Sequence, residues 1–385
     1  MCTFAGMSSI YLDYNSTTPV DPLVLEQMLP WFSQKFGNAA SKTHAFGWEA
    51  EEAVKVAREQ VAASIGAEPS EIIFTSGATE AINLAIRGAM EAYRSKGKHL
   101  ITCATEHKAV LDTCSDLENK GCEVTLLSVD REGKIDLAEL EKAIRVDTVL
   151  VCIMMANNET GVLQDTTSIG KICKSKQVLF FSDTTQSMGK IRVDVQEHGM
   201  DLVCISAHKF YGPKGVGALY VRRKNPRVTL LPQITGGGHE RGLRSGTLNV
   251  PGIVGMGAAA ALAADQLWDY GMNTSRFRVW LEQGLSYYNK ARINGSIKDR
   301  LPNTSNLTLE GLSATTIIKQ LQGIAVSTGS ACTSALPEPS HVLKAMGISD
   351  ADAQSTIRIS VGKYTTEEEV KTVVERFRQL ATDQI

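Results

Sequence analysis

A lysine and an aspartate each follow one of the most apolar segments of the sequence. Asp183 comes directly after one such segment, and Lys209 comes after another, next to Ser206 and His208. An amine that leaves a buried strand is costly unless it is exposed, paired or covalently bonded. The two groups suit a Schiff base between the lysine and a carbonyl compound, with the carboxylate beside a ring nitrogen. Taken alone, Asp183 is better explained as a simple helix N-cap.

A third group could bind a phosphate. Residues 75–80 (Thr-Ser-Gly-Ala-Thr-Glu) follow a predicted strand and begin a predicted helix. Free backbone N–H groups at a helix N-terminus bind anions, although a capped turn would show the same pattern. Pyridoxal phosphate needs a Schiff-base lysine, an acid beside its ring nitrogen and a phosphate seat, and the chain contains all three. No G-x-x-x-x-G-K-[ST] motif occurs, so a nucleoside triphosphate P-loop is excluded.

Two further polar residues follow predicted strands. His107 comes after the segment 99–102, and Asn158 comes after the segment 148–155. A structural loop histidine and an asparagine in a turn are the alternative interpretations. Because ligands bind at the carboxyl ends of the strands in an open α/β sheet, we expect both residues to lie near Lys209.

One of the eight cysteines differs from the others in its surroundings. Seven lie at or near predicted strands or helices, or in the N-terminal tail, whereas Cys332 lies among small residues in the segment 327–335. These neighbours give no packing reason for a thiol, and we expect the segment to be mobile. Only the thiolate of an accessible cysteine is a good nucleophile. Cys332 is therefore the predicted nucleophile, with an incidental loop cysteine as the alternative.

Short β-branched segments alternate with longer amphipathic ones through most of the chain. The predicted strands are 71–75, 99–102, 123–127, 148–155, 177–182 and 201–206, and the predicted helices are 45–64, 79–93, 109–119, 137–144 and 167–175. This alternation is typical of the α/β class, with a mostly parallel sheet and helices on both faces. Several strands are apolar at nearly every position, as expected for strands buried on both sides.

The pattern changes after Val221. A Gly/Arg-rich loop, 236–247, leads to an Ala-rich helical region, and strands and helices then resume at 305–309, 315–322 and 356–361 before a last helix. Thr366 and Glu369 form a capping box at the start of that helix. The glycines in 255–260 indicate close helix packing rather than a dinucleotide fingerprint. We predict a large domain, 15–255, and a small domain made of 1–14 and 256–385 that carries Cys332.

The composition excludes several classes of protein. The 385 residues include 40 basic and 42 acidic ones, so the net charge of −2 offers no electrostatic footprint for nucleic acid or a membrane surface. The longest apolar run, 253–264, is too short for the ~20 residues that span a bilayer. The cysteines show no C-x-x-C spacing and the histidines no H-x-x-x-H spacing, so no metal site is predicted. Cysteines within apolar runs and the absence of a signal-peptide pattern indicate a cytoplasmic protein.

Together these motifs resemble the cysteine desulfurases, which are class V, fold-type I enzymes that use pyridoxal phosphate. The resemblance runs from about Ile10 to Arg378. The motifs that carry it are 11–15 with 17–19, 76–80, 106–108, 157–159, 206–209, 236–241 with 244–247, and Gly-Ser-Ala-Cys at 329–332. The branch resembles the housekeeping iron–sulfur assembly type, because the long segment 333–355 separates Cys332 from the strand that holds Arg358.

The resemblance implies roles for individual residues. Lys209 would form the Schiff base and take the α-proton, His107 would stack on the cofactor ring and help move protons, and the Cys332 thiolate would attack the substrate sulfur. The implied cofactor-binding set is Ala78, Thr79, His107, Asn158, Asp183 at the ring nitrogen, Gln186 at the ring hydroxyl, Ser206, His208, Lys209, and Thr247 from a second subunit. Asn158 and Arg358 would bind the substrate carboxylate, since the arginine fork grips a carboxylate with two hydrogen bonds.

The resemblance also implies an activity and partners. The expected reaction is that of a sulfurtransferase: L-cysteine becomes L-alanine and the sulfur stays as a persulfide on Cys332. The sulfur would supply iron–sulfur cluster assembly, with tRNA thiolation as a further use. A homodimer and an acceptor such as an iron–sulfur scaffold protein are the implied partners. A selenocysteine lyase or another fold-type I aminotransferase or lyase is the nearest alternative, and a non-catalytic binding or sulfur-carrier protein of the same fold is another.

Overall fold

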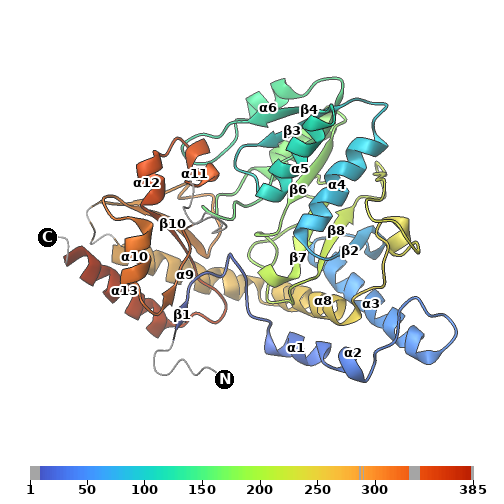
Figure 1. Cartoon of the computed structure of the whole chain (residues 1–385), viewed down its shortest axis with the longest axis horizontal. Helices are drawn as coiled ribbons and strands as arrows, with labels where there is room; N and C mark the ends of the chain where they lie inside the picture. The colour runs from blue at the N-terminus through green and yellow to red at the C-terminus, as the bar shows by residue number, and fades with distance from the viewer. Residues whose placement is uncertain (1–8, 286–287, 289, 329–338, 383–385) are drawn as a thin grey trace.

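The computed structural model describes residues 9–285, 288, 290–328 and 339–382 (Figure 1). The strands are β1 (Ile10–Tyr11), β2 (Ile72–Thr75), β3 (His99–Cys103), β4 (Glu123–Leu127), β5 (Thr148–Cys152), β6 (Leu179–Asp183), β7 (Leu202–Ser206), β8 (Gly217–Val221), β9 (Ala291–Ile293), β10 (Thr304–Leu309), β11 (Ile324–Ala325) and β12 (Thr356–Ser360). The α-helices are α1 (Pro22–Met28), α2 (Pro30–Ser33), α3 (Ala45–Ser64), α4 (Ala78–Ala92), α5 (Lys108–Asn119), α6 (Leu137–Ala143), α7 (Thr166–Ser175), α8 (Val250–Asp265), α9 (Leu267–Leu285), α10 (Ala314–Gln320), α11 (His341–Ala345), α12 (Asp350–Gln354) and α13 (Glu367–Thr382).

A seven-stranded sheet forms the larger part of the molecule. Its strand order is β2-β8-β7-β6-β5-β3-β4, and all strands run parallel except β8, which is antiparallel to both of its neighbours. The predicted mostly parallel sheet is therefore confirmed, and the predicted strands all form. The strand β8 was not predicted. It follows a Gly-Pro turn and is itself a short buried apolar segment, so a local signal for it exists in the sequence. Its pairing with β7 spans a short connection, whereas its pairing with β2 is long-range.

Helices cover both faces of this sheet (Figure 1). The helices α4 and α5 pack on one face with strand residues such as Leu100 and Leu150. The helices α3, α6, α7 and α8 pack on the other face with the next residues along the same strands, Ile101 and Val151. Successive strand side chains point to opposite faces, and here both faces are covered, which explains the unbroken apolar runs in the sequence.

The glycines of α8 allow close helix packing, as predicted. A Cβ on Gly257 would lie 2.5 Å from the Cα of Ala57 in α3, and a Cβ on Gly255 would lie 2.5 Å from the Met28 sulfur in α1. The helix runs on to Asp265, so the boundary predicted at residue 255 falls inside α8.

A smaller part of the molecule contains two further sheets. The strands β12, β10 and β9 form an antiparallel sheet, and β1 pairs with β11. Residues of β1, β10, β12, α9, α10 and α13 share a separate hydrophobic cluster. The predicted capping box at the start of α13 is confirmed, because the backbone N–H of Thr366 donates to Glu369 and that of Glu369 donates to Thr366.

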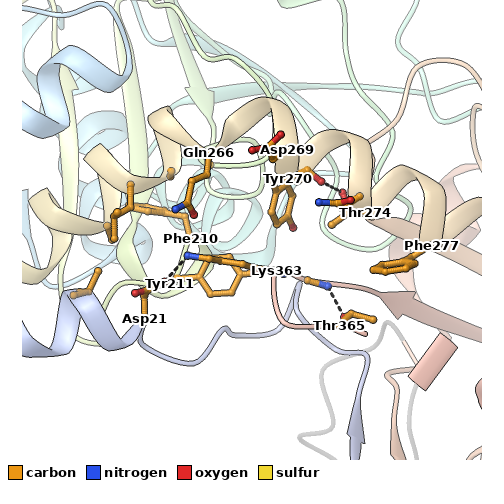
Figure 2. Close-up of a pocket in the computed structure, with 17 residues that line it drawn as sticks. Asp21, Phe210, Tyr211, Gln266, Asp269, Tyr270, Thr274, Phe277, Lys363 and Thr365 are labelled. Carbon is orange, nitrogen blue, oxygen red and sulfur yellow. Dashed lines mark hydrogen bonds and ion pairs between the residues drawn. The ribbon is translucent and has the colours of Figure 1, made fainter. Parts of the chain in front are cut away.

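A pocket of about 460 Å³ lies between the two parts. Figure 2 shows Tyr270 pointing from α9 toward Tyr211, and their ring centroids are 6.4 Å apart. Lys363 Nζ closes one side through an ion pair with Asp21 at 2.5 Å. Tyr211 has a φ of 66°, an uncommon conformation for a bulky residue. Phe210 and Tyr211 line this pocket, while the preceding Lys209 lines the second pocket described below. The segment that holds Lys209 therefore lies between the two pockets.

Within the described residues, no one helix has both the length and the apolar character needed to cross a membrane. The helices α8 and α9 meet that standard only when joined across their 72° bend.

Candidate active site

The carboxyl ends of the parallel strands surround one pocket of about 640 Å³. The chain leaves β2, β3, β5, β6 and β7 at this edge of the sheet, as expected for an open α/β sheet. The pocket brings together most of the predicted site residues, namely Ala78, Thr79, His107, Asn158, Asp183, Gln186, Ser206, His208, Lys209 and Arg358. Residues up to 280 positions apart in the sequence (358 − 78) therefore meet in one place.

Lys209 ends a single 3-10 turn that follows β7. Its Nζ donates to the carbonyl oxygens of Asn15 and Ser16, each at 2.7 Å. Burial, and then the charge of Arg358, lower the pKa of Lys209 to about 8, although Asp183 acts in the opposite direction. The amine is therefore held by neutral acceptors and gives up its proton more readily than an ordinary lysine, as a nucleophilic or basic lysine requires.

Asp183 is the last residue of β6 and is 6% exposed. Its Oδ1 accepts the backbone N–H of Thr185 at 2.8 Å and the Cys204 thiol at 3.2 Å. No described residue donates to its Oδ2. Because the residue lines the pocket, this oxygen is the acceptor that a protonated ring nitrogen would need.

The N-terminus of α4 opens onto the same pocket. Gly77 precedes the helix with a φ of 153°, and no side chain of the described residues caps it. A Cβ on Gly77 would lie 3.8 Å from the Ser206 hydroxyl, an ordinary contact distance, so the backbone conformation rather than crowding favours glycine here. A Cβ on Gly217 would lie 2.7 Å from the Cα of Gly77, which explains why β8 begins with a glycine. An uncapped helix N-terminus beside a hydroxyl suits a phosphate.

His208 adds a neutral imidazole to this end of the pocket. Its Nδ1 lies 3.1 Å from the Thr17 hydroxyl. Burial and the nearby charges of Lys209 and Lys214 lower the pKa of His208 to about 4. Since the Thr17 hydroxyl can donate to Nδ1, the other ring nitrogen can carry the proton and donate to an anion.

Glu80 brings a negative charge to the phosphate seat, and Arg244 balances it. Arg244 donates to both carboxylate oxygens, at 2.8 and 3.3 Å, while Oε2 also accepts the backbone N–H of Ser76. Burial alone would raise the pKa of Glu80, but the bonds from Arg244 and Ser76 hold it below its usual range. The carboxylate thus stays charged and paired when the pocket binds an anion.

Arg358, in β12 of the smaller part, and Asn158, in the loop after β5 of the larger part, meet at the pocket. Arg358 Nη2 donates to Asp13 at 2.6 Å, and Nη1 donates to the carbonyl oxygen of Asn158 at 2.9 Å. Its Nε is buried and has no partner among the described residues. Asn158 contributes a half-buried side-chain amide to the pocket. The guanidinium is rigidly held and suits the recognition of a carboxylate.

His107 caps α5 and faces the pocket. Its Nδ1 accepts the backbone N–H of Ala109 at 3.1 Å, so in the neutral imidazole the proton lies on Nε2. The neighbouring Glu106 is fully buried and accepts the backbone N–H of Met154 at 2.6 Å. Burial raises the pKa of Glu106 well above its usual range, which favours a neutral carboxyl beneath the histidine.

Two predicted residues do not appear in this pocket. Thr247 is exposed in the loop after η3 (Glu240–Gly242) and does not line the pocket. Cys332 lies outside the described residues.

The residues that flank the segment 329–338 are tied to the pocket. Ser327 lines the pocket and exchanges backbone hydrogen bonds with Arg358 at 2.6 and 3.1 Å. On the other side, the Ser340 hydroxyl donates to Glu159 at 2.5 Å. Burial raises the pKa of Glu159 to about 7. Ser327 and Ser340, the described residues on either side of this segment, are therefore both held near the site.

Sequence reasoning missed two residues that hold the site together. Asn15 was noticed only as part of a motif, yet it is 1% exposed and its backbone carbonyl accepts from both Lys209 and Gln186. Lys190 was not noticed, although a lysine in a turn between apolar segments, four residues after Gln186, was an available signal.

The groups present fit pyridoxal phosphate. The amine of Lys209, the unpartnered Oδ2 of Asp183 and the uncapped end of α4 belong to the same pocket. They match the aldehyde, the ring nitrogen and the phosphate of the cofactor in number and in chemistry.

Comparison with known proteins supports the same conclusion. Residues 10–373 match the model of the aminotransferase class-V family. A cysteine desulfurase IscS from Anaeromyxobacter sp. (strain Fw109-5) is 55% identical over 96% of this chain and 93% of its own length. A second cysteine desulfurase IscS, from Pectobacterium carotovorum subsp. carotovorum (strain PC1), is 52% identical over 96% of this chain and 92% of its own length. A solved NifS-like protein superposes with a TM-score of 0.91 at 40% identity, covering 97% of this chain and all of the other. The predicted resemblance and fold class are confirmed.

The pairing of Glu80 with Arg244 predicts how the pocket binds an anion. Arg244→Gln leaves the Glu80 carboxylate unbalanced beside the phosphate seat, and we expect pyridoxal phosphate to bind the cofactor-free protein roughly tenfold more weakly. The double variant Glu80→Gln/Arg244→Gln removes both charges and should bind within about threefold of the unaltered protein. Calorimetric titration gives the dissociation constants. A double variant as weak as Arg244→Gln alone would contradict this account.

Proposed function

The chain belongs to the aminotransferase class-V family and, within it, to the cysteine desulfurases, and we propose that it stores the sulfur of L-cysteine as a persulfide on Cys332. The products are L-alanine and a sulfur atom available for transfer. The observation that carries the proposal is the single pocket that gathers the amine of Lys209, the carboxylate of Asp183 and the guanidinium of Arg358.

Pyridoxal phosphate, when bound, supplies an electron sink for the negative charge left on the substrate α-carbon. The protein's own groups orient the substrate and move the proton. Arg358 and Asn158 would hold the substrate carboxylate, and Lys209 Nζ, with its pKa of about 8, would take the α-proton. His107, with its proton on Nε2, would stack on the ring and relay protons.

Cys332 completes the reaction in this proposal. Its thiolate forms a bond to the substrate sulfur while the bond from that sulfur to the substrate β-carbon breaks. The electron pair of the broken bond passes to the carbon side, where a proton is added and alanine forms. Ser327 lines the pocket and lies five residues before Cys332 (332 − 327), a separation that an extended chain spans over roughly 17 Å. This reach supports delivery of the thiol to the substrate.

A homodimer is part of the proposal, with Thr247 of one copy reaching the phosphate of the other. Thr247 is exposed and does not line the pocket of its own chain. Exposed large apolar side chains support association. They are numerous between α1 and α3, namely Leu23, Leu25, Leu29, Phe32, Phe36, Phe46, Trp48 and Val56, and the rings of Phe36 and Phe46 lie 5.6 Å apart.

We also propose the division into a large domain, 15–255, and a small domain, 1–14 with 256–385. Separate hydrophobic clusters support two domains: two clusters lie around the large sheet and one lies around the small sheets. Met256 and residues 258–260 of α8 pack within a large-sheet cluster. The pairing of β1 with β11 supports placing the N-terminal segment in the small domain.

We propose a cytoplasmic enzyme that supplies sulfur to an iron–sulfur scaffold protein. The six cysteines that the structure describes are all free, which suits a reducing compartment. The relatives named cysteine desulfurase IscS support a role in iron–sulfur assembly.

Detection of a persulfide on Cys332 tests the proposed activity. After incubation with L-cysteine, mass spectrometry of the intact protein and of its peptides should find one added sulfur, on Cys332. Cys332→Ala should keep the visible band of the bound cofactor yet release less than about 1% of the alanine, because a missing nucleophile typically costs more than 10²-fold. Cys122→Ala, which removes a half-buried thiol elsewhere, is the matched control and should react normally. Normal alanine release by Cys332→Ala would refute the proposal.

The dimer is tested by mass and by cofactor affinity. Sedimentation equilibrium should give twice the mass of the chain, for both the unaltered protein and Thr247→Ala. Because the variant removes one hydroxyl donor to the phosphate, its affinity for pyridoxal phosphate should fall roughly 3- to 10-fold. A monomer that binds the cofactor with full affinity would contradict the shared site.

A further inference from the structure

A lysine lies buried directly behind the pocket. Lys190 is 3% exposed and does not line the pocket. Its Nζ donates to the side-chain oxygen of Gln186 at 2.5 Å and to that of Asn15 at 3.0 Å. Both partners are amides, and among the described residues no carboxylate forms an ion pair with this amine. A buried lysine without a counter-ion is costly, so it calls for an explanation.

The surroundings favour the neutral amine. Burial, and then the charges of Lys209 and Arg358, lower the pKa of Lys190 well below its usual range. Asp183 and Asp13 add negative charge near Lys209, but neither contacts Lys190. A neutral amine has two N–H donors, and the two amide oxygens of Gln186 and Asn15 use both of them.

These bonds determine which way the Gln186 amide points. The oxygen and nitrogen of a side-chain amide are told apart only by their partners. Lys190 directs its N–H groups at Gln186 Oε1 and Asn15 Oδ1, and the backbone carbonyl of Asn15 can only accept, so Gln186 turns its Oε1 toward Lys190. Its Nε2 then donates to the backbone carbonyl of Asn15 at 2.9 Å. One N–H of Nε2 is left over, and Gln186 lines the pocket.

The same lysine also fixes Asn15. The Asn15 side-chain oxygen accepts from Lys190 and from Asn303 at 3.1 Å, while its nitrogen donates to Thr304 at 2.8 Å. The Asn15 backbone carbonyl is therefore held in place as the shared acceptor of Gln186 Nε2 and Lys209 Nζ. If the Gln186 amide were turned the other way, its oxygen would face the Asn15 backbone carbonyl and the hydrogen bond between them would be lost.

We propose that Lys190 is a positioning residue that fixes the Gln186 side-chain amide as a hydrogen-bond donor toward the ring hydroxyl oxygen of the cofactor. The inference rests on the proposed cofactor and on the contact between Gln186 and the ring hydroxyl. It adds that the contact depends on a second lysine that never touches the cofactor. Without Lys190, the Gln186 oxygen loses its donor and only the Asn15 backbone carbonyl still orients the amide, so the Nε2 donor is held less firmly toward the ring oxygen.

The experiment compares two cofactors, pyridoxal phosphate and its analogue that lacks the ring hydroxyl, 3-deoxypyridoxal phosphate. Their dissociation constants for the cofactor-free protein are measured by calorimetry. The unaltered protein should prefer pyridoxal phosphate by roughly tenfold, the value of one good hydrogen bond to a polar or charged oxygen. In Lys190→Met the preference should fall below about threefold, mostly through weaker binding of pyridoxal phosphate.

Three comparisons separate positioning from a structural role. Gln186→Leu should lose the preference in the same way, and adding Lys190→Met to it should change the preference no further. Lys171→Met, on the exposed side of α7, should keep the preference of the unaltered protein. Thermal unfolding of each variant is measured alongside, since a merely structural lysine would lower stability and weaken both cofactors equally.

The outcomes are distinct. Equal weakening of both cofactors by Lys190→Met would overturn the role of Lys190, and so would an unchanged preference. An unaltered protein with no preference would overturn the Gln186 contact and with it the inference, while persulfide formation on Cys332 would still support the proposed function. If Lys190→Met does not fold, Lys190→Gln replaces it. That shorter side chain cannot reach both amide oxygens, so a full preference in Lys190→Gln would contradict the proposal.

Discussion

One buried asparagine connects the two parts of the molecule at the point where the chemistry takes place. The backbone N–H of Asn15 donates to Ser360 at 2.9 Å and its side chain contacts Thr304, both in the smaller part. Its carbonyl oxygen accepts from Lys209, which follows β7 in the larger part. Buried polar groups of this kind are stable only when every partner is in place. The position of the reactive amine is therefore coupled to the packing of the N-terminal segment against the small sheet.

The electrostatics of the pocket follow from the close approach of several buried basic side chains. Lys209, Lys190 and Arg358 lie close together, and burial with mutual repulsion lowers the pKa values of both lysines. The carboxylates nearby are paired or hydrogen-bonded: Asp13 with Arg358, and Glu80 with Arg244. The result is a cationic pocket that suits an anionic cofactor, with a lysine that gives up its proton more readily than an ordinary lysine. Such perturbed groups collected in one cleft are typical of active sites.

Much of this arrangement could be predicted because it is local. A parallel strand buried on both faces produces an unbroken apolar run, as in β7, where every residue is buried, and a polar residue directly after it must lie at the ligand-binding edge. That reasoning located Asp183 and Lys209. It could not give the pairing of β8 with the distant strand β2 or the partners of Lys190, whose contact with Asn15 spans 175 positions. Long-range contacts between buried polar groups leave no periodicity in the sequence.

The central claim is that Lys209, rather than a neighbouring lysine, is the amine that binds the cofactor. Two other lysines lie close enough to compete for the cofactor. Lys190 contacts Asn15 and Gln186, which line the pocket, and Lys214 lines the pocket itself. Borohydride reduction of the protein with pyridoxal phosphate, followed by peptide mass mapping, fixes the cofactor to whichever lysine holds it. The account predicts a single modified residue, Lys209. Modification mainly at Lys190 or Lys214, or spread over several lysines, would contradict it.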